Sequence, residues 1–327
     1  MAKNNLRVVV AGIRQLTPRI REYLLRSEDG NALPPFEPGA HVELHTQSPA
    51  SGPIVRHYSL IGGAGNWDDT PDIYRIAVQR EDRQRGSAHI HDTFAIGTAL
   101  QVSHPKNHFP LDRRDAKSLL IAGGIGITPI LSMLRSLVRR GRNFEMVYSG
   151  RAADDMAYRH DVLRLGAGKA RIHVSGADSN NLLDLRGLLA GQPGGTNVYA
   201  CGPAPMIKAV EQAAHELGWD PSRIRNELFS SGPGADDVAF DVELKSSGRL
   251  VHVGRDTSIL DALTAAGVHV LSDCRRGECG LCPLDVLDND GQLVHRDRYL
   301  DEEERASGQT LCICVSRTTG SRLVLDA

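Results

Sequence analysis

Three of the six cysteines of this 327-residue chain, Cys274, Cys279 and Cys282, crowd into one short segment. The spacing C-x4-C-x2-C, with Gly277 and Gly280 between the thiols, lets a backbone loop wrap a metal cluster and turn N–H groups toward the sulfurs. A zinc site is the main alternative, although zinc sites more often pair C-x2-C units. A disulfide framework is typical of small secreted chains rather than of a chain this long. The spacing therefore favours an iron–sulfur cluster, which needs a fourth thiolate.

The cysteine spacing resembles the signature of plant-type [2Fe–2S] ferredoxins. Two residues nearer the C-terminus compete for the fourth ligand position. Cys312 leaves 29 residues after the loop, a common spacing in plant-type ferredoxins. Cys314 opens the segment Cys314-Val315-Ser316-Arg317, which resembles the ligand and following strand of phthalate dioxygenase reductases. This second resemblance favours Cys314, beside the three loop cysteines, and leaves Cys312 as a buried neighbour.

A second motif, Arg56-His57-Tyr58-Ser59-Leu60, resembles the R-x-Y-S-[L/I] pattern of the ferredoxin–NADP reductase superfamily. That resemblance implies a flavin, with the arginine on its phosphate, the tyrosine against its ring and the Ser59 hydroxyl near N5, where hydride arrives. The flavin would carry the redox chemistry while the protein supplies binding and electrostatics. Arg56, His57, Tyr58 and Ser59 are therefore expected to bind it. FMN is favoured over FAD because no additional adenosine-binding segment is evident and because similar reductases use FMN.

A later strand and turn support the flavin prediction. The strand Ala77-Val78-Gln79 precedes Arg85-Gly86-Ser87-Ala88, and together they resemble the strand and Gly-Ser turn that bind the flavin phosphate in the superfamily. Backbone amides at a helix start are well placed to bind a phosphate. The family form has two glycines before the serine, whereas Arg85 replaces the first of them here. Arg85 is therefore a candidate phosphate contact, although a side chain that faces solvent is the favoured alternative.

A glycine-rich turn, Gly123-Gly124-Ile125-Gly126-Ile127-Thr128-Pro129, follows an apolar run and opens a predicted helix. Glycine lets the backbone approach a pyrophosphate closely, and proline is compatible with the first helical turn. The segment resembles the G-G-[IV]-G-[IV]-T-P motif of the same superfamily. This resemblance implies that Gly124 and Gly126 bind a nicotinamide dinucleotide, with Thr128 as a further contact near the flavin.

Two more segments resemble motifs of the superfamily. Cys201-Gly202-Pro203 follows an apolar strand and resembles its C-G-P motif, in which the thiol borders the nicotinamide. The alternative for Cys201 is a buried cysteine at a strand end. Phe229 occupies the place of the family's E-x-F segment, which implies a ring near the flavin, although an ordinary core phenylalanine is the alternative. Ser59, Cys201 and Phe229 are thus the candidate catalytic residues.

Three changes in sequence pattern predict the elements that position these motifs. Residues 1–110 contain short alternating strands with Gly and Pro punctuation, which predicts an antiparallel β-barrel for the flavin. Residues 111–230 alternate apolar strands with helical stretches, which predicts a doubly wound α/β domain for the nucleotide. Residues 231–238 are a predicted linker. Residues 239–327 predict a compact α+β unit, for which the resemblance implies a β-grasp ferredoxin fold.

The composition excludes several other classes of protein. The chain has 41% hydrophobic and 24% charged residues and a formal net charge of −2, without the basic stripe expected for nucleic-acid binding. No apolar run approaches the roughly 20 residues that span a bilayer. The polar N-terminus lacks the apolar region of a signal peptide. We therefore expect a cytoplasmic protein that binds neither nucleic acid nor membrane.

The order of the four motifs identifies the chain as a member of the phthalate dioxygenase reductase and vanillate O-demethylase reductase-like family. Membership implies a reductase that takes hydride from NAD(P)H, with NADH favoured, onto FMN. Single electrons then leave through the [2Fe–2S] cluster to a partner, the terminal component of a two-component Rieske-type oxygenase or O-demethylase. The alternative is a ferredoxin-type reductase that is not tied to an oxygenase. A self-contained oxygenase would need a further haem or Rieske domain, and a non-catalytic electron carrier would not need the flavin and nicotinamide motifs.

Overall fold

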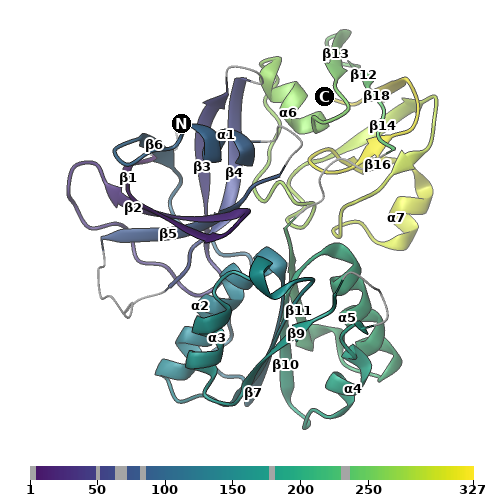
Figure 1. Ribbon diagram of the computed structural model, residues 1–327. Helices are drawn as coiled ribbons and strands as arrows, with labels where there is room; N and C mark the ends of the chain where they lie inside the picture. Colours follow the sequence, from purple (N-terminus) through teal and green to yellow (C-terminus); the bar gives the residue numbers. More distant parts are fainter. Residues whose placement is uncertain (1–4, 49–51, 63–71, 82–85, 177–180, 230–235) are drawn as a thin grey trace. The chain divides into compact units, whose positions relative to one another are not determined.

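The structure is a computed structural model that describes residues 5–48, 52–62, 72–81, 86–176, 181–229 and 236–327 (Figure 1). The chain divides into two compact units, Met1–Glu227 and Leu228–Ala327. The first unit contains a six-stranded antiparallel sheet and a five-stranded sheet, and the second contains a five-stranded mixed sheet. These architectures confirm the predicted fold classes: an antiparallel barrel, a doubly wound α/β layer and an α+β unit.

The antiparallel sheet has the strand order β4-β3-β6-β1-β2-β5. Its elements are β1 (Leu6–Thr17), β2 (Ile20–Ser27), β3 (His41–Ser48), β4 (Gly52–Ser59), β5 (Ile73–Gln79) and β6 (Ala99–Val102), with α1 (Ser87–Thr93) after β5. Alternate side chains such as Tyr23 and Leu25 face a shared apolar core, as the period of two requires. The two edge strands approach each other, because the Ile61 N–H after β4 donates to the Arg75 carbonyl of β5 at 2.9 Å. The sheet therefore curls into a barrel.

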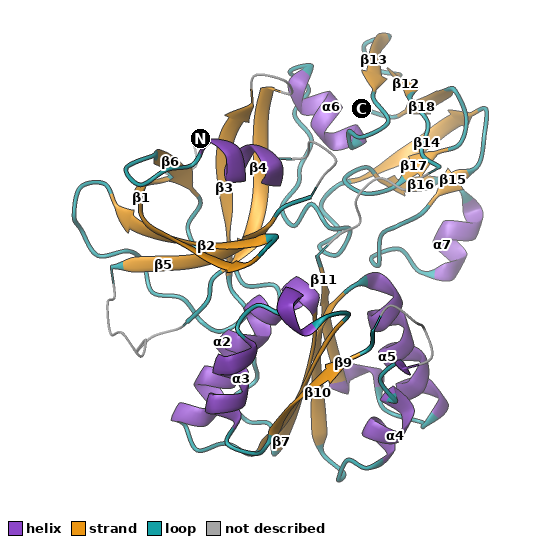
Figure 2. Cartoon of the chain, viewed as in Figure 1, coloured by secondary structure: helices purple, strands orange, loops and turns teal. Residues whose placement is uncertain are grey.

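The second sheet has the order β11-β10-β7-β8-β9. Its elements are β7 (Lys117–Gly123), α2 (Ile127–Arg139), β8 (Phe144–Gly150), α3 (Arg159–Gly166), β9 (Ala170–Val174), α4 (Leu185–Ala190), β10 (Thr196–Gly202), α5 (Ala204–Glu216) and β11 (Ile224–Leu228). The central strand β7 pairs in parallel with β8 and β10, and Leu119, Leu120 and Ile121 are fully buried. Figure 2 shows α2 and α3 on one face of this sheet and α4 and α5 on the other. The continuous apolar run reflects burial on both faces.

The second unit is built on a sheet of order β13-β12-β18-β14-β16. Its elements are β12 (Phe240–Leu244), β13 (Arg249–Val253), α6 (Ile259–Ala265), β14 (Pro283–Asn289), β15 (Leu293–Val294), α7 (Glu302–Ser307), β16 (Thr310–Cys312), β17 (Arg317–Thr318) and β18 (Arg322–Leu325). Strand β12 pairs in parallel with the C-terminal β18 and antiparallel with β13. Helix α6 packs its apolar residues Ile259, Leu260 and Leu263 into the same core as β12. This arrangement leaves the cysteine loop between α6 and β14.

The helices of the described segments are short. Both α2 and α5 have 13 residues, about 20 Å of helix at 1.5 Å per residue. Within the part of the chain that the structure describes, no helix has the length and apolar character needed to cross a membrane.

Candidate functional site

The glycine-rich turn lies where the order of the parallel sheet reverses. From the central β7 the chain continues outward through β8 and β9, and then returns to place β10 on the other side of β7. The carboxyl ends of β7 and β10 are therefore adjacent and their loops diverge, which is where ligands bind in open α/β sheets. Gly124 has φ +54°, a conformation that favours glycine. The turn leads directly into α2.

Gly126 and Cys201 are brought into backbone contact at this crevice. A Cβ on Gly126 would lie 2.3 Å from the carbonyl oxygen of Cys201, so only glycine fits between the two motifs. The Cys201 side chain is fully buried, at the end of β10. Gly202 is equally close to the other motif, because its own Cβ would lie 3.0 Å from Cα of Gly123. The two segments predicted to bind the nicotinamide thus meet at one crevice.

Thr128 lies in the first turn of α2, on the same crevice. Its side chain is buried, and its hydroxyl donates to the Ile125 carbonyl at 3.1 Å. The hydrogen bond closes the turn onto the helix. The described contacts of Thr128 are therefore local to the glycine-rich segment.

Ser59, at the end of β4, has a buried hydroxyl with no hydrogen-bond partner among the described residues. It lies opposite His41 on β3. A buried hydroxyl without a partner costs free energy, and such a group needs an explanation, such as a ligand. The hydroxyl fits the predicted role of binding a polar edge of a flavin. Its neighbour Tyr58 packs against the barrel core, and burial raises the pKa of its phenol.

The His57 side chain belongs to a buried polar cluster on the same face of β3 and β4. Its ring stacks on His41, with centroids 5.2 Å apart and an interplanar angle of 11°. Its Nε2 lies 3.9 Å from the Glu43 carboxylate, which also accepts a hydrogen bond from Lys106 Nζ at 2.7 Å. Burial alone would raise the pKa of Glu43, but hydrogen bonds from His45 and Lys106 hold it well below its ordinary value. His57 is therefore fixed by protein contacts beside Ser59.

Arg56, the first residue of the motif, is half-buried, and its Nη1 donates to the Val55 carbonyl at 2.8 Å. The predicted phosphate turn begins at Gly86, with φ +27°. Ser87 is buried, and its hydroxyl accepts the Glu81 N–H at 3.1 Å. Gly86 and Ser87 therefore open α1, with the half-buried Ala88 next in the helix. The predicted contact Arg85 lies outside the described residues.

The strand before that turn presents two different faces. Val78 lies in the barrel core, and its carbonyl accepts a hydrogen bond from His91 Nε2 at 2.9 Å. Ala77 is buried on the opposite face, and Gln79 is exposed. The structure thus places Ala77 and Gln79, rather than the Val78 side chain, on the outer face of β5.

Ser132 joins the flavin motif to the helix of the nicotinamide motif, and no sequence pattern had singled it out. Its hydroxyl donates to the Leu60 carbonyl at 2.6 Å and accepts the Gly62 N–H at 3.0 Å. Leu60 is the last residue of the RHYSL segment. A serine among the apolar residues of α2 is the only sequence signal that could have pointed to it.

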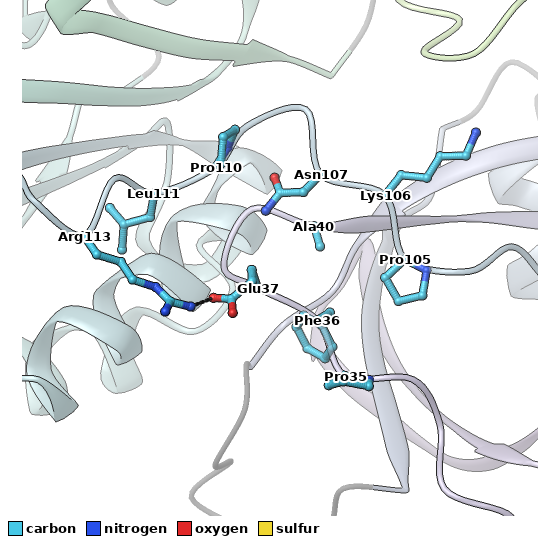
Figure 3. Close-up of a pocket in the computed structure, with 10 residues that line it drawn as sticks. All are labelled: Pro35, Phe36, Glu37, Ala40, Pro105, Lys106, Asn107, Pro110, Leu111 and Arg113. Carbon is cyan, nitrogen blue, oxygen red and sulfur yellow. Dashed lines mark ion pairs between the residues drawn. The ribbon is translucent and has the colours of Figure 1, made fainter.

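A separate pocket of about 450 Å³ lies beside the start of β3. Figure 3 shows that two stretches of chain line it, with Glu37 and Arg113 forming an ion pair across one side. None of the predicted cofactor-binding residues lines this pocket. The predicted flavin site is instead the region of Ser59 described above.

The cysteine loop of the second unit folds around the sulfur of Cys274. Three backbone N–H groups point at this sulfur, from Arg276 at 3.4 Å and from Glu278 and Cys279 at 3.3 Å each. Several N–H donors around one sulfur are the environment that stabilises a thiolate bound to iron. The loop therefore fits an iron–sulfur cluster better than a free thiol.

Glycine is required at two positions of this loop. Gly277 and Gly280 have φ +75° and +70°, in the left-handed region that other residues rarely adopt. A Cβ would also lie 2.7 Å from Cα of Asp297 at Gly277, and 2.1 Å from the Tyr299 ring at Gly280. These close approaches explain the glycines between the cysteines.

The five thiols of this unit lie as one pair and one group of three. Cys274 and Cys279 lie within hydrogen-bonding reach of each other. Cys282 accepts hydrogen bonds from the thiols of Cys312 and Cys314, which lower its pKa to about 3. Among the residues that the structure describes, no three His, Cys, Asp or Glu side chains are gathered closely enough around one point to hold a single metal ion. A two-iron cluster takes two protein ligands on each iron, so the pair and two members of the group of three suffice to hold one.

The two candidate fourth ligands have different surroundings. Cys312 lies within β16, opposite Pro283 of β14, and its thiol also reaches the Asp297 carboxylate. Cys314 lies in the turn after β16, where its sulfur accepts the backbone N–H of Gly277 in the cysteine loop. Both thiols reach Cys282, but Cys314 also contacts the backbone of the cysteine loop, whereas Cys312 also contacts an acidic side chain. The choice of Cys314 as the fourth ligand stays a prediction.

Phe229, the last candidate catalytic residue, directly follows β11 and is half-buried. It lies in the second compact unit, next to the boundary at Glu227. The described contacts assign it no partner in the crevice of the first unit, so its predicted role stays a prediction.

Comparisons with known proteins match nearly the whole chain. Residues 103–224 match a family described as dimethylamine monooxygenase subunit DmmA-like, N-terminal domain, and residues 242–319 match the 2Fe-2S iron-sulfur cluster binding domain. A heme-dependent oxidative N-demethylase beta subunit of Ectopseudomonas mendocina is 41% identical over 98% of both chains. A vanillate O-demethylase oxidoreductase of a Pseudomonas species is 35% identical over 98% of this chain and 99% of the relative. The solved structure of phthalate dioxygenase reductase superposes with a TM-score of 0.84 at 31% identity, covering 99% of this chain and 98% of that one.

Proposed function

Because this chain belongs to the phthalate dioxygenase reductase and vanillate O-demethylase reductase-like family, we propose that it is the reductase component of an oxygenase or demethylase system. It takes hydride from NAD(P)H onto FMN and passes single electrons through a [2Fe–2S] cluster to a partner protein. The observation that carries this proposal is the presence in one chain of the Gly126–Cys201 crevice, the Ser59 hydroxyl without a partner among the described residues, and the clustered cysteine thiols.

The residues of the chain act by binding and orienting rather than by acid–base catalysis. Gly124 and Gly126 bring the backbone close to the dinucleotide, and Cys201 and Gly202 form the opposite wall of the same crevice. The Ser59 hydroxyl holds the polar edge of the flavin, and Arg56 and the turn at Gly86 and Ser87 hold its phosphate. When bound, the flavin accepts an electron pair and the cluster relays electrons one at a time.

The cofactor set proposed here is FMN, NADH and one [2Fe–2S] cluster. Cys274, Cys279, Cys282 and Cys314 hold the cluster, because these four sulfurs line the same loop. Phe229 is proposed to lie near the flavin ring and to yield when the nicotinamide docks. The place of action is the cytoplasm, where NADH is available.

The proposed partner is the terminal component of a Rieske-type oxygenase or O-demethylase. Several relatives are named as subunits of oxygenases, including a carnitine monooxygenase reductase subunit and a phenoxybenzoate dioxygenase subunit beta. A haem-dependent N-demethylase is a second candidate partner. It is favoured by the relative of 41% identity and by the match to the DmmA-like family.

Anaerobic titration of the purified holoprotein with NADH tests the proposed electron path. We expect the flavin absorbance to bleach and the [2Fe–2S] cluster to become reduced in the same titration, with NADPH less effective. Extraction of the flavin and its mass would identify FMN. Bleaching of the flavin with no reduction of the cluster would contradict the relay, and release of FAD would contradict the flavin assignment.

Replacing Ser59 by alanine tests the proposed flavin contact. We expect the rate of flavin reduction by NADH, per bound flavin, to fall about tenfold, because one hydrogen bond to a group that gains charge is lost. Ser118→Ala is a matched control, since the Ser118 hydroxyl is also buried with no partner among the described residues, but at the start of β7. Stopped-flow absorbance measures both rates. Equal rates of flavin reduction in the two variants would contradict the proposed contact between Ser59 and the flavin.

A further inference from the structure

We propose that Ser132 is a positioning residue for hydride transfer, because its hydroxyl fixes the end of the flavin-binding strand to the helix that carries the nicotinamide turn. This inference rests on the proposed function, since it concerns the geometry between the two cofactors. It concerns a residue outside all four motifs. Ser132 lies in the second turn of α2, and its side chain is fully buried.

The hydroxyl of Ser132 is used twice. It donates to the Leu60 carbonyl at 2.6 Å and accepts the N–H of Gly62 at 3.0 Å. One hydroxyl has one donor and two acceptor sites, so this bridge uses its donor and one lone pair. Both partners are backbone groups, so the bridge fixes the path of the chain as it leaves Ser59 rather than the rotamer of a side chain.

The same short segment is fixed at two other points, both from the barrel. The Leu60 N–H donates to the Ala40 carbonyl at 2.8 Å, and the Ile61 N–H donates to the Arg75 carbonyl at 2.9 Å. Ser132 holds the same segment from the α/β layer, through its hydrogen bonds to Leu60 and Gly62. Gly62 has φ +133°, which favours glycine at the point where the bridge ends.

The position of Ser132 on α2 links it to the nicotinamide turn. Thr128 precedes Ser132 by four residues and therefore lies on the same helix face, and its hydroxyl closes the glycine-rich turn through Ile125. Gly126, two residues before Thr128, contacts the backbone of Cys201. One helical turn of α2 thus connects the crevice to Ser132. The hydrogen bonds of Ser132 then connect this helix to Leu60, the residue next to Ser59.

Hydride transfer is sensitive to such a connection. The two reacting atoms must come within about 3–3.5 Å, and a displacement of about 1 Å can slow a reaction about 100-fold. When the hydroxyl is removed, the Leu60 carbonyl and the Gly62 N–H are left without their partner in a buried site, and the strand end can shift to recover hydrogen bonds. The consequence falls on the distance between the cofactors, whereas the groups that bind each cofactor remain.

The test compares Ser132→Ala with Ser136→Ala in the full-length holoprotein. Ser136 lies one turn further on the same helix face and is also buried, so Ser136→Ala matches the change in chemistry without touching the bridge. Ser132→Cys keeps a group of similar size that is a weaker donor and acceptor. Stopped-flow measurement under anaerobic conditions gives the limiting rate of flavin reduction by NADH and the NADH concentration at half that rate.

We expect the limiting rate per bound flavin to fall about 10-fold to 100-fold in Ser132→Ala, to fall less in Ser132→Cys, and to stay near the wild-type value in Ser136→Ala. Flavin content, the flavin midpoint potential and the half-saturating NADH concentration should change little. A general structural defect would instead change these three quantities together with the rate. A Ser132→Ala protein that reduces its flavin at the wild-type rate, or that loses activity only in proportion to lost flavin, overturns the inference. If NADH does not reduce the flavin of the wild-type protein, the proposed function is wrong, and the inference is wrong with it.

Discussion

The Cys314→Ser protein is expected to lose its [2Fe–2S] cluster and, with it, all electron transfer to the partner oxygenase. Four thiolates hold such a cluster, and Cys314 is the C-terminal cysteine whose sulfur accepts the Gly277 N–H of the cysteine loop. The iron content and the visible absorbance of the cluster should fall close to zero. Reduction of the flavin by NADH should continue, because none of the groups proposed to bind the flavin or the nicotinamide is a cluster cysteine.

Cys312→Ser is the matched control for this result. Cys312 is as buried as Cys314 and also reaches Cys282, but it lies within β16 and contacts Asp297. We expect this variant to keep its cluster, with at most a shift in the midpoint potential. Cluster retention in Cys314→Ser together with cluster loss in Cys312→Ser would reverse the assignment. Iron analysis and electron paramagnetic resonance of the reduced proteins distinguish the two outcomes.

Gly126→Ala is expected to slow flavin reduction by NADH about 100-fold. The new methyl group would lie 2.3 Å from the Cys201 carbonyl oxygen and 2.7 Å from the Gly202 nitrogen, and both are backbone atoms that cannot rotate away. This clash is relieved only if the ends of β7 and β10 separate, which widens the crevice proposed to bind the dinucleotide. Overpacking of this kind also costs about 1–3 kcal/mol of stability, so the thermal midpoint should fall.

The comparison with Gly194→Ala separates the local clash from a general effect of alanine. Gly194 is exposed, and a Cβ there would have no heavy atom within 4 Å. This control should reduce its flavin at the wild-type rate. Photochemical reduction of the flavin provides a second control, because it bypasses NADH and should reduce the cluster normally in Gly126→Ala. A slow cluster reduction in that experiment would place the defect beyond the nicotinamide crevice.

The elements with strong periodic patterns were predictable from the sequence. The apolar run before the glycine-rich turn forms β7, and the helix predicted after that turn runs from Ile127 to Arg139. The short strands after the cysteine loop were not predicted. β15 and β17 have two residues each and pair only with each other, and such short segments contain too few residues to show a period of two.

The residue types of the site were also determined by the sequence, because each motif is a local arrangement of neighbouring residues. Glycines spaced along one turn, thiols spaced along one loop and the Arg-x-Tyr-Ser strand indicate their chemistry without reference to the rest of the chain. The solved structure of phthalate dioxygenase reductase and the vanillate O-demethylase oxidoreductase relative confirm the fold and family that these motifs predicted.

Only the tertiary structure decided which of these local groups meet and what holds them in place. Ser132 and Leu60 are 72 positions apart, and a serine on the buried face of a helix gives no sign of a distant carbonyl partner. Cys312 and Cys314 are almost equivalent by spacing, yet one lies in a strand beside a carboxylate and the other in a turn that faces the cluster loop. The spacing of residues along a segment determines which chemical groups it offers. Long-range packing and backbone hydrogen bonds determine which other groups those chemical groups contact.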